Sequence, residues 1–219
     1  MKFLVFLGSV RDSSPPEPAR LGERVARACV RHFETNHDEH EVELIDPLDF
    51  DTAGIFKPHF SYRRSEAPDA LNDLADRIKA ADGYVMVSPE YNHSMSPALA
   101  HLLNHFGSSL FAYKPSVIVS YSAGQWGGAR AAMAMRGFLS ELGCLPVSAM
   151  IHVPKAQEIL DGQGQLQKGQ DADHWAGYFG RALLQLLWWA EATQTQRDRQ
   201  DPHSLIRNFT RDPSQRNAP

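Results

Sequence analysis

The feature that most constrains this chain is the alternation of short apolar runs with segments of helical period. Five runs suit buried strands, and they fall at residues 2–8, 41–45, 84–87, 115–121 and 145–153. Apolar residues recur at helical spacing in the segments 21–33, 71–78, 97–106, 129–142 and 172–192. Strands that alternate with helices in this way predict a parallel sheet with helices on both faces.

The clearest unit is residues 84–106, where an apolar strand passes through a polar loop into a helix. Ser96 is suited to cap that helix and Pro97 to occupy its first position. The loop of residues 89–96 therefore lies at the carboxyl end of a strand and beside a helix N-terminus. Ligands bind at such places in open α/β sheets, so this loop is the first candidate for a site.

Length and composition limit the domain organisation and the partners. With 219 residues, 42% of them hydrophobic, the chain suits one large domain, which we expect at residues 1–195 before a polar tail at 196–219. The net charge of -4, without a basic run interleaved with aromatics, predicts no nucleic-acid partner. The longest apolar block, residues 183–190, is too short to span a membrane, so we expect no membrane association.

The cysteines and the N-terminus indicate the compartment. Cys29 and Cys144 cannot form a disulfide framework, and neither stands at a metal-ligand spacing. The apolar run at residues 2–7 breaks into a polar segment without the long apolar region of a signal peptide. We therefore expect two reduced structural thiols in a cytoplasmic protein.

Three polar loops follow the first, third and fourth predicted strands, and a doubly wound sheet brings them to one edge. The first, residues 8–14, offers hydroxyls, backbone N–H groups and a guanidinium before a helix, which suits a phosphate or an ordinary Ser/Pro turn. The third-strand loop, residues 89–96, presents amides and a planar ring to a flat ligand. The fourth-strand loop, residues 122–128, carries three glycines that let the backbone approach a ligand closely.

For several single residues the sequence leaves two roles open or disfavours one of them. Glu90 suits either a general acid or a solvated carboxylate, and Tyr91 either a ligand wall or a core aromatic. His93 has no second histidine at zinc spacing, which favours a surface residue. Ser122 is a poor nucleophile candidate, because Ser120 stands where the G-x-S-x-G elbow needs glycine. The G-x-G-x-x-G fingerprint is absent after the first strand, so a classical Rossmann NAD(P) site is not expected.

In these three loops the chain resembles the NAD(P)H-dependent FMN reductase family of flavodoxin-like proteins, which includes quinone, azo-dye and chromate reductases. The resemblance covers about residues 2–155. Its motifs are Gly8-Ser9-x-Arg11-x-x-Ser14, then Ser88-Pro89-Glu90-Tyr91-Asn92-x-Ser94, and finally Ser122-x-Gly124-x-x-Gly127-Gly128-x-Arg130.

The resemblance implies a five-stranded parallel sheet of order 2-1-3-4-5 in three α/β/α layers, with FMN bound at its edge. It implies that Ser9, Arg11 and Ser14 hold the phosphate, that Pro89, Glu90, Tyr91 and Asn92 line the isoalloxazine ring, and that Ser122, Gly124, Gly127 and Gly128 cradle its pyrimidine side. The family often has Asn two residues beyond the motif serine, where this chain has Pro16. Pro15 and Pro16 remove two backbone donors beside the phosphate.

The implied activity is hydride transfer from NADPH or NADH through flavin N5 to a quinone-like or other small acceptor, with no catalytic side chain. Two alternatives remain: an FMN-binding electron carrier or regulatory flavoprotein without efficient NAD(P)H turnover, and a flavin-free interaction protein. We also expect a homodimer or a dimer of dimers. Its basis is the aromatic loop at residues 50–62 together with Trp188 and Trp189. The alternative hypothesis is that both tryptophans pack on the chain's own sheet.

Overall fold

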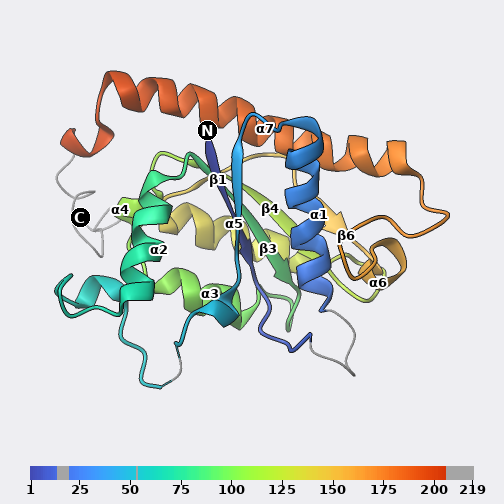
Figure 1. Ribbon diagram of the computed structural model, residues 1–219, viewed down its shortest axis with the longest axis horizontal. Helices are drawn as coiled ribbons and strands as arrows, with labels where there is room; N and C mark the ends of the chain where they lie inside the picture. Colours follow the sequence, from blue (N-terminus) through green and yellow to red (C-terminus); the bar gives the residue numbers. More distant parts are fainter. Residues whose placement is uncertain (14–19, 53, 206–219) are drawn as a thin grey trace.

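One parallel sheet forms the centre of the protein, whose computed structural model describes residues 1–13, 20–52 and 54–205. Its order is β2-β1-β3-β4-β5, with β6 also paired to β4, and every pairing is parallel. This confirms the expected flavodoxin-like order. Figure 1 shows the sheet between its helices. The strands are β1 (Lys2–Leu7), β2 (Glu41–Ile45), β3 (Gly83–Pro89), β4 (Pro115–Tyr121), β5 (Leu145–Pro146) and β6 (Ile151–Val153).

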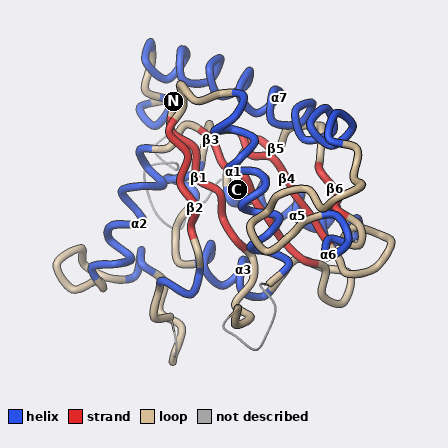
Figure 2. Tube along the Cα trace, turned by 45° about the vertical axis from the view of Figure 1, so that its right-hand side comes forward, coloured by secondary structure: helices blue, strands red, loops and turns tan. Residues whose placement is uncertain are grey.

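Helices cover both faces of the sheet. The first layer contains α1, α6 and α7, and the second contains α2, α3, α4 and α5. Figure 2 shows the strands as a central layer with α7 along one side and α2 and α3 along the other. The helices are α1 (Leu21–Asn36), α2 (Asp69–Ala80), α3 (Pro97–Asn104), α4 (Ser108–Phe111), α5 (Ala129–Leu142), α6 (Ala156–Ile159) and α7 (Ala172–Arg199).

The inner strands are buried along their whole length, as their apolar runs predicted. Every residue of β3 and β4 is buried. Along β3, Val85 and Val87 face the layer of α1 and α7, whereas Tyr84 and Met86 face the layer of α2 to α5. Because both faces of these strands are buried, their sequences are continuous apolar runs and do not alternate between apolar and polar residues.

The expected fifth strand at 145–153 is divided into β5 and β6 by residues 147–150. Here side chains bind the backbone: Arg136 Nη2 donates to the carbonyl oxygens of Val147 and Ser148 at 3.0 and 2.7 Å. The N–H of Ala149 donates to Gln185 Oε1 at 3.1 Å. The backbone therefore leaves the regular ladder without leaving these groups unpaired.

The last helix is longer than the expected 172–192 and runs to Arg199, beyond the expected domain boundary at 195. An ion pair near its end holds it: Arg197 Nη2 lies 2.9 Å from Asp82 Oδ1, and Nη1 donates to the carbonyl oxygen of Tyr113 at 3.0 Å. Asp82 Oδ2 also accepts from the N–H of Lys2 at 3.0 Å. The polar sequence after 192 is thus an exposed helix end anchored at the amino ends of the strands. Residues 206–219 of the expected tail lie outside the described part.

The predicted interface requires the aromatics of the loop between β2 and α2 to be exposed, and the structure shows that one of them, Phe50, is buried. Phe50 is 8% exposed, beneath the guanidinium of Arg77, whose carbon lies 5.8 Å from the ring centroid. Phe56 is 44% exposed, and its ring packs 4.8 Å from that of His105. Short 3-10 turns, Pro47–Asp49 and His59–Ser61, give this loop local order that its irregular sequence did not predict.

Both cysteines are buried, and neither forms a disulfide. Burial raises the pKa of the Cys29 thiol to about 12, which keeps it protonated and unreactive. In the part of the chain that the structure describes, no helix is both long and apolar enough to cross a membrane.

Candidate functional site

The three candidate loops meet at the carboxyl ends of β1, β3 and β4, which are neighbours in the sheet. We name each loop after the strand that it follows: loop one (8–14), loop three (89–96) and loop four (122–128). They enclose a cleft of about 450 Å³, a size ordinary for small-molecule sites. Six predicted residues line it: Ser9, Arg11, Pro89, Glu90, Tyr91 and Ser122. Asn92, Gly124, Gly127 and Gly128 lie in the same loops but do not line the cleft, and Ser14 lies outside the described residues.

Loop one is pressed against the end of β3. The N–H of Gly8 donates to the carbonyl oxygen of Val87 at 2.8 Å. A Cβ atom at position 8 would lie 2.5 Å from that oxygen, closer than contact allows. Glycine at this position therefore lets loop one continue directly from β1 over the neighbouring strand.

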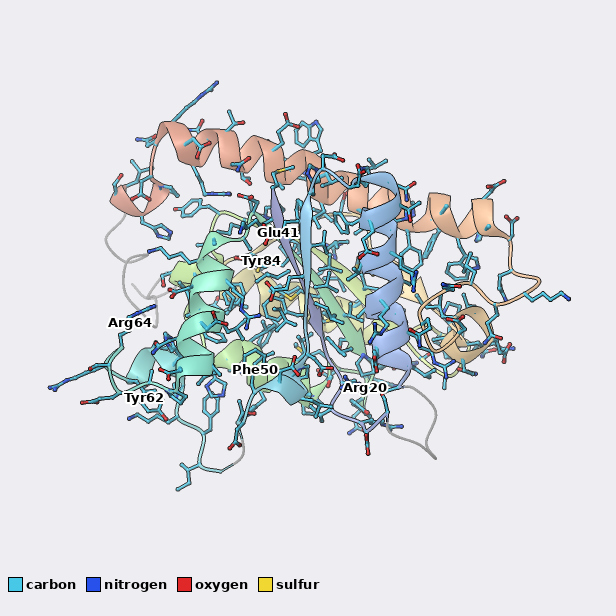
Figure 3. All side chains as sticks on the ribbon, viewed as in Figure 1. Arg20, Glu41, Phe50, Tyr62, Arg64 and Tyr84 are labelled. Atoms are coloured by element: carbon cyan, nitrogen blue, oxygen red, sulfur yellow. The ribbon has the colours of Figure 1, made fainter. Side chains whose placement is uncertain are left out.

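Arg20, which the sequence interpretation did not select, fixes the position of loop one. Its side chain is only 5% exposed and forms ion pairs with Asp46 and, at 3.6 Å, with Glu23. Its Nη1 donates to the carbonyl oxygen of Ser9 at 2.7 Å. Figure 3 shows Arg20 at the end of α1 nearest the strand termini. A buried cation thus joins loop one to the segment that follows β2.

Tyr121 forms the floor of the cleft between loops one and four. It ends β4, is 5% exposed and shares a side-chain hydrogen bond with Ser9. Burial raises the pKa of its phenol, so the hydroxyl stays protonated. A Cβ at Gly22 would lie 2.4 Å from that hydroxyl, which explains why α1 carries a glycine in its first turn.

Loop three is a tight turn that holds Tyr91 toward the cleft. The backbones of Tyr91 and Ser94 exchange hydrogen bonds of 3.0 and 2.9 Å, and Asn92 and His93 between them have φ of 50° and 62°. Two consecutive left-handed residues are typical of a type I′ turn. Tyr91 is 36% exposed, with the Arg11 guanidinium carbon 6.0 Å from its ring centroid. The core-aromatic alternative for Tyr91 is therefore wrong.

Glu90 is paired with Arg130 across the cleft wall. Glu90 Oε1 accepts from Arg130 Nε at 2.6 Å, and the side chain is only 10% exposed. Burial opposes ionisation, but the Arg130 hydrogen bonds and charge outweigh it and lower the pKa of Glu90. The carboxylate is consequently ionised at neutral pH, and the solvated-residue and general-acid alternatives both disagree with its contacts.

The glycines of loop four have two different roles. Gly127 and Gly128 have φ of 59° and 75°, and a Cβ at either would lie within 3.2 Å of neighbouring atoms, so the turn itself requires them. Gly124 has open space where a Cβ would stand. Within the described part of the chain, the N–H groups of Gly124 and Gln125 donate to no acceptor. Loop four therefore offers free backbone donors beside the cleft.

The charges around the cleft favour an anion. Three guanidinium groups line it, from Arg11, Arg20 and Arg24. Two carboxylates also line it, and Glu90 is paired with Arg130, as Arg20 is with Asp46 and Glu23. The Arg11 guanidinium and the Ser9 hydroxyl, beside the first turn of α1, suit a phosphate or another small anion.

The structure adds residues to the cleft that the motifs did not predict. Arg20 and Arg24 stand four residues apart at the start of α1, a spacing that could have indicated a shared face. Gln157 arrives from α6, and no local pattern links that helix to loop four, although Gln157 Nε2 donates to the Ala123 carbonyl at 3.0 Å. The unpredicted lining residues are Asp12, Arg20, Leu21, Arg24, Tyr121, Ala123 and Gln157.

Comparisons with known proteins agree with this geometry. The chain is 34% identical over 139 residues to an NADPH azoreductase of Bacillus sp. (strain OY1-2), a match that covers 62% of this chain and 71% of that protein. It is 34% identical over 82 residues to a 2-hydroxy-1,4-benzoquinone reductase of Burkholderia sp, covering 36% of this chain and 45% of that protein. The chain thus spans less than half the length of this second relative.

A solved structure shares the fold across nearly the whole chain. It is the flavoenzyme NAD(P)H:(acceptor) oxidoreductase of Paracoccus denitrificans, with a TM-score of 0.65 and 20% identity over 87% of this chain and 97% of that one. The model of the family described as NADPH-dependent FMN reductase matches residues 1–158, which include all three loops of the cleft. The chain therefore belongs to the NADPH-dependent FMN reductase family.

Proposed function

We propose that this protein is a cytoplasmic FMN-dependent NAD(P)H oxidoreductase that reduces quinone-like or other small acceptors in the cleft between loops one, three and four. Membership of the family supports FMN and NADPH as the cofactor and co-substrate. The observation that carries the proposal is the convergence of the three loops on one cleft of about 450 Å³ with three arginines on its wall. FMN, when bound, supplies a two-electron carrier that takes hydride from NAD(P)H and passes it to an acceptor.

The residues present fit FMN. Its dianionic phosphate needs donors and positive charge, which Arg11 and the Ser9 hydroxyl provide at the start of α1, where Arg20 holds the Ser9 backbone in place. Its flat ring needs a planar wall, which Pro89 and Tyr91 provide in loop three. Its pyrimidine edge needs hydrogen-bond donors, which the free N–H groups of loop four provide. We assign Ser14 to the phosphate as well, from the family motif alone.

The remaining residues bind and orient rather than react. Loop three is held rigid because its type I′ turn is closed by backbone hydrogen bonds and because Ser88 Oγ accepts from the N–H of Ser96 at 2.8 Å. Asn92 shapes this turn. Loop four keeps its form because Ser122 Oγ donates to the carbonyl oxygen of Gly124 at 2.8 Å. Fixed donors of this kind stabilise developing negative charge without reorganising.

A binding and turnover experiment tests the proposal. Purified protein, freed of flavin and titrated with FMN, is expected to bind about one equivalent per chain. With NADPH under argon the bound flavin is expected to lose its yellow colour, and a quinone is expected to restore it. Protein that binds no FMN contradicts the proposal. Protein that binds FMN but is not reduced by NADPH or NADH favours the electron-carrier alternative.

Replacing Glu90 by glutamine is expected to change the NADPH oxidation rate less than about threefold, since an ionised carboxylate has no proton to donate. Loss of a general acid instead costs about 100-fold or more and removes a limb of the pH profile. Rates at about pH 5 to pH 8 check this, with Glu158→Gln as a control at an exposed carboxylate. A rate loss in Glu90→Gln of about 100-fold that is largest at low pH, where a carboxylic acid is protonated, would restore the acid role to Glu90.

A further inference from the structure

The exposed residues on the outer face of α7 are spaced so that the face is complementary to a second copy of itself running in the opposite direction. Eight exposed residues, spaced three or four apart, form one line along the helix, within an arc of about 80°. We call this line the α7 stripe. Its members are Asp173, Gly177, Arg181, Leu184, Trp188, Glu191, Thr195 and Arg199.

The stripe is symmetric in position and complementary in charge about its midpoint at position 186. When a second copy of α7 is turned end for end, Arg181 faces Glu191, and Asp173 faces Arg199. In a parallel pair of helices each charged residue would lie opposite the same residue of the second copy, and the two like charges would repel each other. An antiparallel pair therefore places two kinds of opposite charges together, each twice.

The middle of the stripe is apolar and uncovered. Leu184 is 54% exposed and Trp188 is 62% exposed, and Trp189 beside them is 45% exposed. The two indole rings contact each other edge to face, with centroids 4.7 Å apart. The alternative that both tryptophans pack on the chain's own sheet is therefore wrong. Exposed tryptophans flanked by charges are typical of the centre and rim of a protein interface.

We propose that the α7 stripe is a self-association surface, on which two copies of this chain pair through antiparallel α7 helices. Leu184 of each copy packs against Trp188 of the other, and the charged pairs lie on either side. In Figures 1 and 2, α7 runs along the margin of the molecule, and no helix or strand of the described residues covers its outer side. An anionic membrane surface fits less well, because two carboxylates interrupt the stripe.

This surface is separate from the cleft. None of the residues that line the cleft belongs to α7, and the last turn of α7 is anchored through Arg197 to Asp82 at the amino ends of the strands. The proposal therefore does not depend on flavin binding, and it holds or fails independently of the proposed function.

Charge reversal combined with sedimentation velocity tests the pairing and its direction. The wild-type chain is expected to be dimeric at micromolar concentration. Arg181→Glu alone, or Glu191→Arg alone, is expected to raise the dimer Kd about tenfold or more, because each creates two repulsive pairs. Mixing the two variants, or combining both changes in one chain, is expected to restore the dimer. Leu184→Glu is expected to raise the Kd about 100-fold or more.

Lys168→Glu, the same charge change at an exposed loop residue, is the matched control, and circular dichroism checks that each variant is folded. Arg181 also donates to the carbonyl oxygen of Met150 at 2.9 Å, so a change at Arg181 removes a hydrogen bond within the chain as well. Glu191→Arg therefore tests the charge pairing independently of that hydrogen bond. A monomeric wild-type chain overturns the proposal. So does a dimer whose Kd ignores the charge changes, or one that the mixture fails to restore.

Discussion

Replacing Arg20 by methionine is expected to weaken FMN binding roughly 100-fold, which corresponds to about 2.7 kcal/mol. The buried guanidinium holds the Ser9 carbonyl and the Asp46 carboxylate, and each charge-assisted hydrogen bond contributes ~1.5–3 kcal/mol. Methionine fills much of the volume but removes the donor that the Ser9 carbonyl and Asp46 Oδ2 share, and it removes a positive charge from the cleft. Loop one then loses the position from which it contacts a phosphate.

Fluorescence titration of flavin-free protein with FMN measures this effect. Arg20→Lys keeps the charge without the planar fork and is expected to fall between wild type and Arg20→Met. Arg31→Met is the matched control, because this exposed arginine of α1 donates to the distant Gln163 carbonyl. Equal FMN affinity in Arg20→Met and wild type would refute the role of Arg20, while a wild-type chain that binds no FMN would refute the proposed function instead.

Replacing His105 by leucine is expected to remove a large part of the acid sensitivity of folding. His105 is 4% exposed, and within the described residues neither of its ring nitrogens has a hydrogen-bond partner. Burial, with a smaller contribution from the charges of His101 and His59, lowers its pKa to about 4. The folded state therefore keeps this ring neutral at pH values where the unfolded chain has already bound a proton.

The sign of the effect follows from that difference. Below the ordinary histidine pKa of about 6.5 the unfolded state gains protons that the folded state does not bind, so stability falls as pH falls. Between about pH 7 and pH 4.5 this site is expected to cost about 2–3 kcal/mol. Urea unfolding at both pH values measures it in wild type, in His105→Leu and in the control His174→Leu, which alters an exposed ring. Equal losses in all three would contradict the assignment.

Elements whose signals are local were predictable from sequence. Ser96 accepts from the N–H of Ala98 at 3.1 Å and Pro97 begins α3, as the capping pattern indicated. The five apolar runs correspond to the sheet, and the motifs after β1, β3 and β4 lie together because parallel strands end at one edge. The strand order came from family resemblance, since alternation alone does not specify which strands pair.

Features that depend on distant side chains were not predictable. The break between β5 and β6 depends on Arg136 and Gln185, which come from two different helices. Phe50 is buried in the apolar layer of α2 to α5 and beneath Arg77, and no local period reveals those contacts. Arg20 was missed because a lone arginine between prolines and a helix resembles a solvated residue, whereas its partner Asp46 lies beyond β2.

The contacts of Asp82 bear on the order of folding events. One carboxylate binds the N–H of Lys2 and the guanidinium of Arg197, residues from opposite ends of the described chain. Bringing Lys2 and Arg197 to Asp82 closes two long segments of chain, and the entropy that this costs is offset only when most of the sheet has assembled. These contacts are therefore expected to form late in folding. The end of α7 therefore belongs to the same cooperative folding unit as β1. Ending the chain before Arg197 would remove the ion pair with Asp82 and would also destabilise the contact of Asp82 with the first residue of β1.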